Sequence, residues 1–188
     1  MRRIAVIAGT AELPTPEEQA AAFHLGRLLG ENSLTLVFDG STEGVIATVA
    51  DTCLQHGGRL VGIVVPGAAG RPDLTERREA DSPDAARAQT VELVDAWIGL
   101  PHGVGSLDDA FAVWDWPGLR HSEQPLGLLD SGGYYSGLLK TASDDGVDRF
   151  VRESQRGRLV LSTSAEDLLR RLADYRPPET RRDAPYED

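Results

Sequence analysis

The chain has 188 residues, 40% of them hydrophobic, and a formal net charge of −11. The length predicts one domain, and the charge argues against a nucleic-acid backbone or an anionic membrane as partner, because both are negatively charged. No apolar run approaches the ~20 residues of a membrane span, and the single cysteine, Cys53, excludes a disulfide framework. We therefore expect a cytoplasmic protein in which Cys53 is a buried core residue.

Short apolar runs alternate with helical patterns along the chain. Runs of this kind are typical of strands that are buried on both faces of a parallel sheet. The expected strands are Ile4 to Ala8, Leu34 to Phe38, Leu60 to Val65, Ala96 to Leu100, Leu126 to Leu129 and Leu159 to Leu161. The expected helices are Pro16 to Leu29, Glu43 to His56, Asp84 to Val94, Leu107 to Trp114, Tyr134 to Ser143 and Ala165 to Ala173. This alternation predicts a doubly wound, Rossmann-like α/β fold over residues 1–178, with a mostly parallel sheet and helices on both faces.

Two segments fall outside this alternation. The stretch from Gly67 to Pro83 is rich in Gly, Pro, Arg and Asp, and we expect a loop that is either functional or a surface excursion. Residues 179–188 are charged and contain proline, which predicts a disordered tail. Just before the tail, Ser164 is expected to cap the last helix, with Asp167 three residues further on.

A glycine-containing loop follows the expected strand at Ala96 to Leu100 and opens a helix. Backbone N–H groups and the positive end of a helix dipole suit a phosphate at such a point, and Gly103 and Gly105 would let the phosphate come close to the backbone. The alternative is a plain strand-to-helix turn with Ser106 as the N-cap and Asp109 at the third helical position. The loop lies beyond the carboxyl end of a strand, where ligands bind in doubly wound sheets.

Two stretches resemble motifs of the Lonely Guy (LOG) family, the cytokinin-nucleotide phosphoribohydrolases. DAWIGLPHGVGSLDDAF (residues 95–111) is similar to the P-G-G-x-G-T-x-x-E signature, and LVFDGSTEGVIA (residues 36–47) is similar to L-V-Y-G-G-G-x-x-G-L-M-G. The likeness covers residues 3 to 178. It implies a phosphate or nucleotide site made by Gly9, Thr10, Gly40, Ser41, Thr42, His102, Gly103, Val104, Gly105 and Ser106. It also implies a homodimer, while the spacing of carboxylates and histidines implies no metal, and no cofactor is expected.

Members of this family cleave the N-glycosidic bond of a nucleoside 5′-monophosphate and release the free base and ribose 5-phosphate, using an arginine and a glutamate. At the glutamate position this chain has Asp109, which is shorter by one methylene. The family arginine falls on Ala86 and the lysine after it on Arg87. We therefore expect Asp109 and Arg87 to be the catalytic pair. One residue along a helix corresponds to ~100° of rotation, so Arg87 would need some rearrangement to take the role of the family arginine. Arg77 and Arg78 in the preceding loop are reserve candidates for this role.

Three further departures alter the charge of the implied site. His102 replaces a glycine and would be strained if the position needs positive φ. It could act as an acid or base near neutral pH, or it could be a solvent-facing turn residue. Asp39 replaces another glycine and Glu43 enters just before a helix. These carboxylates disfavour a phosphate and could instead bind ribose hydroxyls or a cation.

Two functions therefore stay open. The first is a LOG-like hydrolase of a nucleoside monophosphate. The second is a divergent member of the family that binds a nucleotide or sugar phosphate without this hydrolysis, or a pathway-specific enzyme with altered chemistry. In either case the expected ligand is a small molecule. The hydrolase hypothesis requires that Arg87 and Asp109 face the same pocket.

Overall fold

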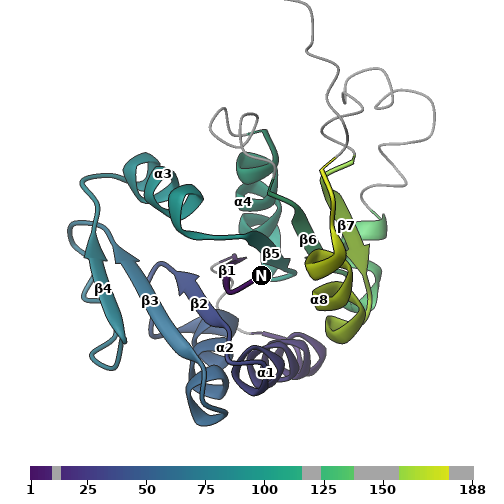
Figure 1. The fold of residues 1–188 in the computed structure, drawn as a ribbon, viewed down its shortest axis with the longest axis horizontal. Helices are drawn as coiled ribbons and strands as arrows, with labels where there is room; N and C mark the ends of the chain where they lie inside the picture. The colour runs from purple at the N-terminus through teal and green to yellow at the C-terminus, as the bar shows by residue number, and fades with distance from the viewer. Residues whose placement is uncertain (10–13, 116–123, 138–156, 178–188) are drawn as a thin grey trace, which may run out of the picture.

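A computed structural model describes residues 1–9, 14–115, 124–137 and 157–177 of the chain. Seven strands form one sheet in the order β4-β3-β2-β1-β5-β6-β7, and every neighbouring pair is parallel (Figure 1). The strands are β1 (Arg3–Ala8), β2 (Thr35–Phe38), β3 (Arg59–Val64), β4 (Glu76–Glu79), β5 (Ala96–Leu100), β6 (Leu126–Leu129) and β7 (Leu159–Ser162). The predicted doubly wound α/β fold is confirmed. The predicted tail, residues 179–188, lies outside the described residues.

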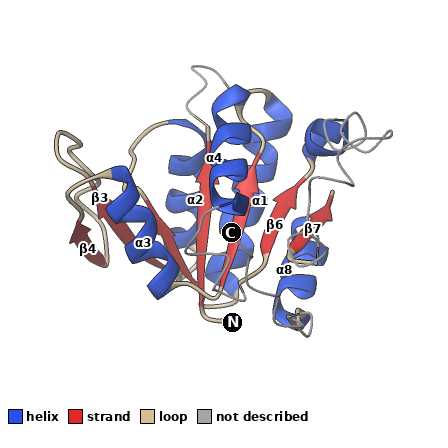
Figure 2. Cartoon of the chain, turned by 90° about the horizontal axis from the view of Figure 1, so that it is seen from above, coloured by secondary structure: helices blue, strands red, loops and turns tan. Residues whose placement is uncertain are grey.

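Helices cover both faces of the sheet. They are α1 (Pro16–Glu31), α2 (Gly44–Gln55), α3 (Pro83–Leu93), α4 (Gly103–Asp115) and α8 (Ala165–Asp174), with a short 3₁₀ helix η1 (Ser131–Gly133) after β6. Helices α1, α2 and α8 pack on one face, and α3 and α4 lie in front of the other face in Figure 2. Side-chain caps fix where several helices begin. Thr15 and Glu18 form a capping box at α1, and Ser82 and Ser164 cap α3 and α8.

Strand β4 is the one strand among the described residues that the sequence prediction missed. It lies within the stretch from Gly67 to Pro83, which was expected to be a loop, and it pairs with β3 at the sheet edge. Its sequence, Glu-Arg-Arg-Glu, has no apolar alternation because an edge strand need not bury a face. Charged side chains also protect an edge from pairing with other chains. Arg78 pairs with Glu76 at 2.6 Å and Arg77 with Glu79 at 3.6 Å.

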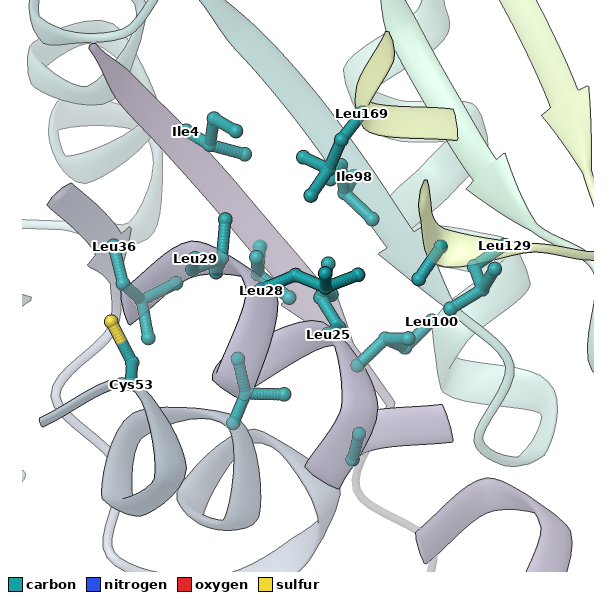
Figure 3. Close-up of a cluster of buried hydrophobic side chains, with 14 of the residues drawn as sticks. Ile4, Leu25, Leu28, Leu29, Leu36, Cys53, Ile98, Leu100, Leu129 and Leu169 are labelled. Carbon is teal, nitrogen blue, oxygen red and sulfur yellow. The ribbon is translucent and has the colours of Figure 1, made fainter. Parts of the chain in front are cut away.

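The larger of two buried clusters lies between the sheet and helices α1, α2 and α8 (Figure 3). Leu25 and Leu29 of α1 pack there against Ile98 of β5, and all three are fully buried. Cys53 is also fully buried, as predicted. Burial raises the pKa of its thiol to about 11, so the thiolate that would react is disfavoured.

Helices α1 and α2 approach closely at two glycines of α1, one turn apart. A Cβ atom on Gly26 would lie 2.5 Å from the carbonyl oxygen of Val49, and one on Gly30 would lie 2.6 Å from the carbonyl oxygen of Cys53. Both obstacles are backbone atoms of α2, which cannot move aside as a flexible side chain can. The two glycines therefore set the distance between the helices.

We predict that Gly26→Ala destabilises the protein. Overpacking costs about 1–3 kcal/mol, while the better helix propensity of alanine returns only about 1 kcal/mol. The measurement is urea unfolding of the wild type and the variant. Gly137→Ala is the matched control, because a Cβ there would meet nothing within 4 Å. Equal stability of Gly26→Ala and the wild type would show that the two helices can separate freely.

Candidate functional site

A cavity of about 240 Å³ lies over the sheet between α3 and α4. Helix α3 contacts β3, and α4 contacts β1 and β5, which leaves a space over β2, between the two helices. The part of the wall formed by the strands is apolar and includes Ala5, Val37, Ile63 and Trp97. Strand β1, with β2 on one side and β5 on the other, is the point at which the strand order reverses. Ligands bind at this point in doubly wound folds.

Three charged side chains line this cavity, each from a different element. Asp39 follows β2, Arg87 lies on α3 and Asp109 lies on α4. The structure thus brings the two predicted catalytic residues into one cavity, together with a carboxylate at a position where the family motif has glycine. One positive and two negative groups beside an apolar wall can bind a polar ligand that carries an apolar ring.

The carboxyl group of Asp109 is disfavoured in its charged form. Its pKa is raised chiefly by burial; the positive charge of Arg87 opposes this shift, and the negative charges of Asp108 and Asp39 add to it. Desolvation of this kind is typical of carboxylates at functional sites. Arg87 is therefore the charge that favours an ionised Asp109.

Arg87 shares its helix face with the residue before it. Ala86 and Arg87 both line the cavity, so the one-residue displacement from the family arginine leaves Arg87 on the cavity wall. Its side chain is 31% exposed, and its guanidinium lies 3.3 Å from the carboxylate of Asp84, in the first turn of α3. Arg77 and Arg78, the reserve candidates, belong to β4 and do not line the cavity.

The glycine-containing loop is shorter than predicted, because α4 begins at Gly103 rather than at Leu107. Ser106 therefore lies inside the helix, and its expected role as N-cap is wrong. Gly103 has φ 67°, the left-handed conformation that favours glycine. Its carbonyl oxygen accepts a hydrogen bond of 2.5 Å from the hydroxyl of Tyr134. Val104, Gly105 and Ser106 complete the first turn of α4, and the side chains of Val104 and Ser106 lie outside what the structure describes.

His102 is fully buried, so the expectation of a solvent-facing turn residue is wrong. Its Nδ1 lies 3.4 Å from a carboxylate oxygen of Glu18 at the start of α1. A Cβ on Gly44, at the start of α2, would be 3.9 Å from its Nε2. The imidazole therefore fills the space between two helix starts. The positive φ falls on Gly103, and His102 avoids the strain that positive φ would impose.

The turn after β2 is held in place from two sides. The Asp39 carboxylate accepts a hydrogen bond of 2.9 Å from the backbone N–H of Ser41. The carbonyl of Gly40, which has φ 77°, accepts one of 2.9 Å from the backbone N–H of Arg71. Thr42 is exposed beyond this turn. Glu43 is the N-cap residue of α2 and makes no side-chain cap.

The residues predicted to bind phosphate lie beyond the carboxyl ends of the strands, beside the cavity rather than on its walls. Gly9 is buried directly after β1, and Gly40, Ser41, Thr42, His102 and Gly103 follow β2 and β5. Parallel strands bring these turns to one edge. Thr10 lies outside the described residues. Their role as phosphate ligands therefore stays a prediction.

Sequence reasoning missed two residues at this site. The sequence predicts no role for Trp97, yet this residue lines the cavity and donates a hydrogen bond of 2.9 Å from Nε1 to Gln124. Tyr134, which holds Gly103, was not singled out. Neither has a local signal, because the contacts join segments that are far apart in the sequence. Among the described residues, no group of three or more His, Cys, Asp or Glu side chains could hold a metal ion, and no helix is long and apolar enough to cross a membrane.

Fold and cavity together define a Rossmann-like protein with a charged cavity at the switch point of its sheet. Comparison with known proteins identifies the family. A family model described as "possible lysine decarboxylase" matches residues 46–172. The probable cytokinin riboside 5′-monophosphate phosphoribohydrolase LOGL5 of Oryza sativa subsp. japonica is 34% identical over 181 residues, which cover 94% of this chain and 74% of the relative. The Arabidopsis thaliana enzyme LOG7 is 33% identical over 94% of this chain and 83% of its own length.

The chain therefore belongs to the LOG family. Among solved structures, the molybdenum cofactor binding protein of Rippkaea orientalis superposes with a TM-score of 0.68 at 18% identity, covering 92% of this chain and 96% of that protein. A likeness at this low identity shows that the two proteins share the fold.

We predict that Asp109→Asn raises the melting temperature at neutral pH. A raised carboxyl pKa means that the folded state disfavours the charged form above that pKa, and asparagine removes this cost. The difference should shrink as the pH falls through the folded pKa and vanish below about pH 4, where aspartate is protonated in both the folded and the unfolded state. Thermal unfolding of both proteins between pH 3.5 and 7.5 measures the effect. A less stable Asp109→Asn at pH 7 would show that the pairing with Arg87 outweighs the burial of Asp109.

Proposed function

We propose that this protein hydrolyses the N-glycosidic bond of a nucleoside 5′-monophosphate and releases the free base and ribose 5-phosphate. The observation that carries the proposal is the position of Arg87 and Asp109, which line one cavity from two different helices. Membership of the LOG family supports it, because the relatives named above are phosphoribohydrolases of a riboside 5′-monophosphate. The mechanism has three requirements, which are an anchored phosphate, a stabilised ribosyl cation and an attacking water.

The start of α4 is the proposed anchor for the phosphate. Backbone N–H groups in the first turn of a helix have no partner within the helix and carry the positive end of its dipole. Gly103 provides the turn into this helix, and the Tyr134 hydroxyl holds the Gly103 carbonyl. Arg87 adds a full positive charge on the cavity wall. Anchoring the phosphate fixes the distance from the sugar to the catalytic groups.

Asp109 is the proposed stabiliser of the reaction centre. As the bond between C1′ and the base nitrogen breaks, positive charge develops on the ribose ring, and a nearby carboxylate lowers the energy of that state. The carboxylate must be ionised to do so. Burial raises the pKa of Asp109 and Arg87 opposes the rise, so activity should decline toward acidic pH as Asp109 is protonated. The apolar wall with Trp97 suits the planar base.

The second candidate is a family member that binds the nucleotide without cleaving it. Two observations favour it. Ala86 stands on the cavity wall where the family arginine falls, and Asp109 is one methylene shorter than the family glutamate. A misplacement of about 1 Å can lower a rate by roughly 100-fold.

An assay of base release tests the proposal. Purified protein is incubated with adenosine, guanosine, cytidine and isoprenylated adenosine monophosphates, and the free base is measured by chromatography. We predict release from at least one substrate and a loss of roughly 100-fold or more in Asp109→Asn and in Arg87→Ala, because each removes a charge that stabilises the transition state.

Two control variants show whether these losses are specific. Asp108→Asn removes the neighbouring charge on α4, and Arg27→Ala removes an arginine that pairs with Glu31 on α1. Both should retain activity within a few fold. If the protein releases base from none of the substrates while the monophosphates raise its melting temperature, the hydrolase hypothesis is wrong and the protein binds nucleotides without cleaving them.

We also propose that the protein forms a homodimer, as the family resemblance implies. The surface of α4 supports this proposal. Phe111 is 44% exposed, and its ring centroid lies 5.9 Å from that of Trp114. Both rings border a shallow apolar groove that Leu107 and Leu159 also line. An exposed aromatic side chain beside an apolar groove is a feature that a contact with another chain would cover.

Light scattering after size exclusion tests this assembly. We predict a mass twice the 20.3 kDa of one chain and a shift toward the monomer in Phe111→Asp, because a charge would be buried in the contact. Phe23→Asp is the matched control. Phe23 is 50% exposed on α1, at the opposite face of the sheet, and its replacement should leave the mass unchanged. A monomeric wild type at micromolar concentration would refute the assembly.

A further inference from the structure

Asp39 lies at the carboxyl end of β2, next to the central strand of the sheet. It directly follows β2, and the order β3-β2-β1-β5-β6-β7 is the order of a dinucleotide-binding sheet with β4 added at one edge. In that fold the group that accepts hydrogen bonds from ribose hydroxyls is a carboxylate further along the chain from the first glycine turn. Asp39 lines the cavity together with Arg87 and Asp109. The topology thus places a carboxylate where a ribose would lie.

The turn that carries Asp39 is fixed before any ligand arrives. The backbone N–H of Arg71 donates to the Gly40 carbonyl. The Arg71 side chain is only 8% exposed, and its guanidinium pairs with Asp51 at 2.6 Å and with Asp73 at 2.7 Å. A Cβ on Gly40 would lie 3.1 Å from Val64 of β3. The Asp39 carboxylate itself is held by the N–H of Ser41. A carboxylate on a fixed turn at the cavity wall loses little conformational entropy when it binds a ligand.

Charge decides which part of a nucleotide this carboxylate would contact. A phosphate would be repelled by Asp39 and is attracted instead to the start of α4 and to Arg87. A divalent cation would be repelled by Arg87, which lines the same cavity. The planar base suits the apolar wall with Trp97. The sugar hydroxyls are then the donors left for Asp39, and a carboxylate can accept hydrogen bonds from two neighbouring hydroxyls.

We propose that Asp39 accepts hydrogen bonds from the 2′- and 3′-hydroxyls of the ribose and makes the site selective for ribonucleotides over deoxyribonucleotides. This inference rests on the proposed nucleotide site. It concerns a residue that differs from the family motif, which has glycine at this position. Asp39 is a specificity-determining residue, while Asp109 acts at C1′.

The test compares the affinity for AMP, 2′-deoxy-AMP and 3′-deoxy-AMP by calorimetry. The wild type should bind AMP about 10- to 100-fold more tightly than either deoxynucleotide, as expected for a lost hydrogen bond to a charged group. Asp39→Asn keeps an oxygen for the Ser41 N–H but loses the charge, and Asp39→Gly restores the residue of the family motif. In both variants the ratio between AMP and the deoxynucleotides should fall toward one.

Asp108→Asn is the matched control, because Asp108 and Asp39 both raise the pKa of Asp109 through their charge. If Asp39 acts only through its charge, Asp39→Asn and Asp108→Asn should each change the affinities for AMP, 2′-deoxy-AMP and 3′-deoxy-AMP equally. The ratio between AMP and the deoxynucleotides would then be the same as in the wild type, and this result would overturn the inference. Failure to bind AMP at all would overturn it as well. If base release is absent from the wild type but the ratio still depends on Asp39, the hydrolase proposal fails while this inference stands.

Discussion

The parallel pairing of β1 with both β2 and β5 is the constraint on which the rest of the molecule depends. Because the three strands run in the same direction, the turns that follow them meet at one edge of the sheet. The chain then reverses its order at β1, which places α1 and α2 on one face and α3 and α4 on the other. The space between α3 and α4 becomes a cavity because α3 packs on β3 and α4 on β1 and β5, so neither helix packs closely on β2 between them.

The cavity combines groups that do not stabilise one another well. Asp109 is desolvated and lies near the like charge of Asp39, and Arg87 offsets only part of this cost, so the pKa of Asp109 remains raised. A fold that was selected for stability alone would replace such a carboxylate by a neutral residue. The buried imidazole of His102 is different, since it stands where the family motif has glycine and fills space between the starts of two helices.

The structure shows the surroundings of each position at which the chain differs from the LOG motifs. His102 is tolerated because the left-handed conformation falls on Gly103. Ala86 occupies the position of the family arginine, and the next residue, Arg87, also lines the cavity. Asp39 has no structural role that glycine could not fill, apart from its bond to Ser41, and this supports a role toward a ligand. The motif positions thus divide into those that maintain the fold and those that set the chemistry of the cavity.

The sequence by itself determined the order of strands and helices, because buried parallel strands are short apolar runs and helices carry their own caps, such as Thr15 and Ser164. It also pointed to Asp109 and Arg87 through motif resemblance. It could not reveal β4, whose charged residues have no apolar period, or the true start of α4 at Gly103. Only the tertiary structure decided that Asp39, Arg87 and Asp109 share one cavity and that His102 is buried, because these relations depend on contacts between residues far apart in the chain.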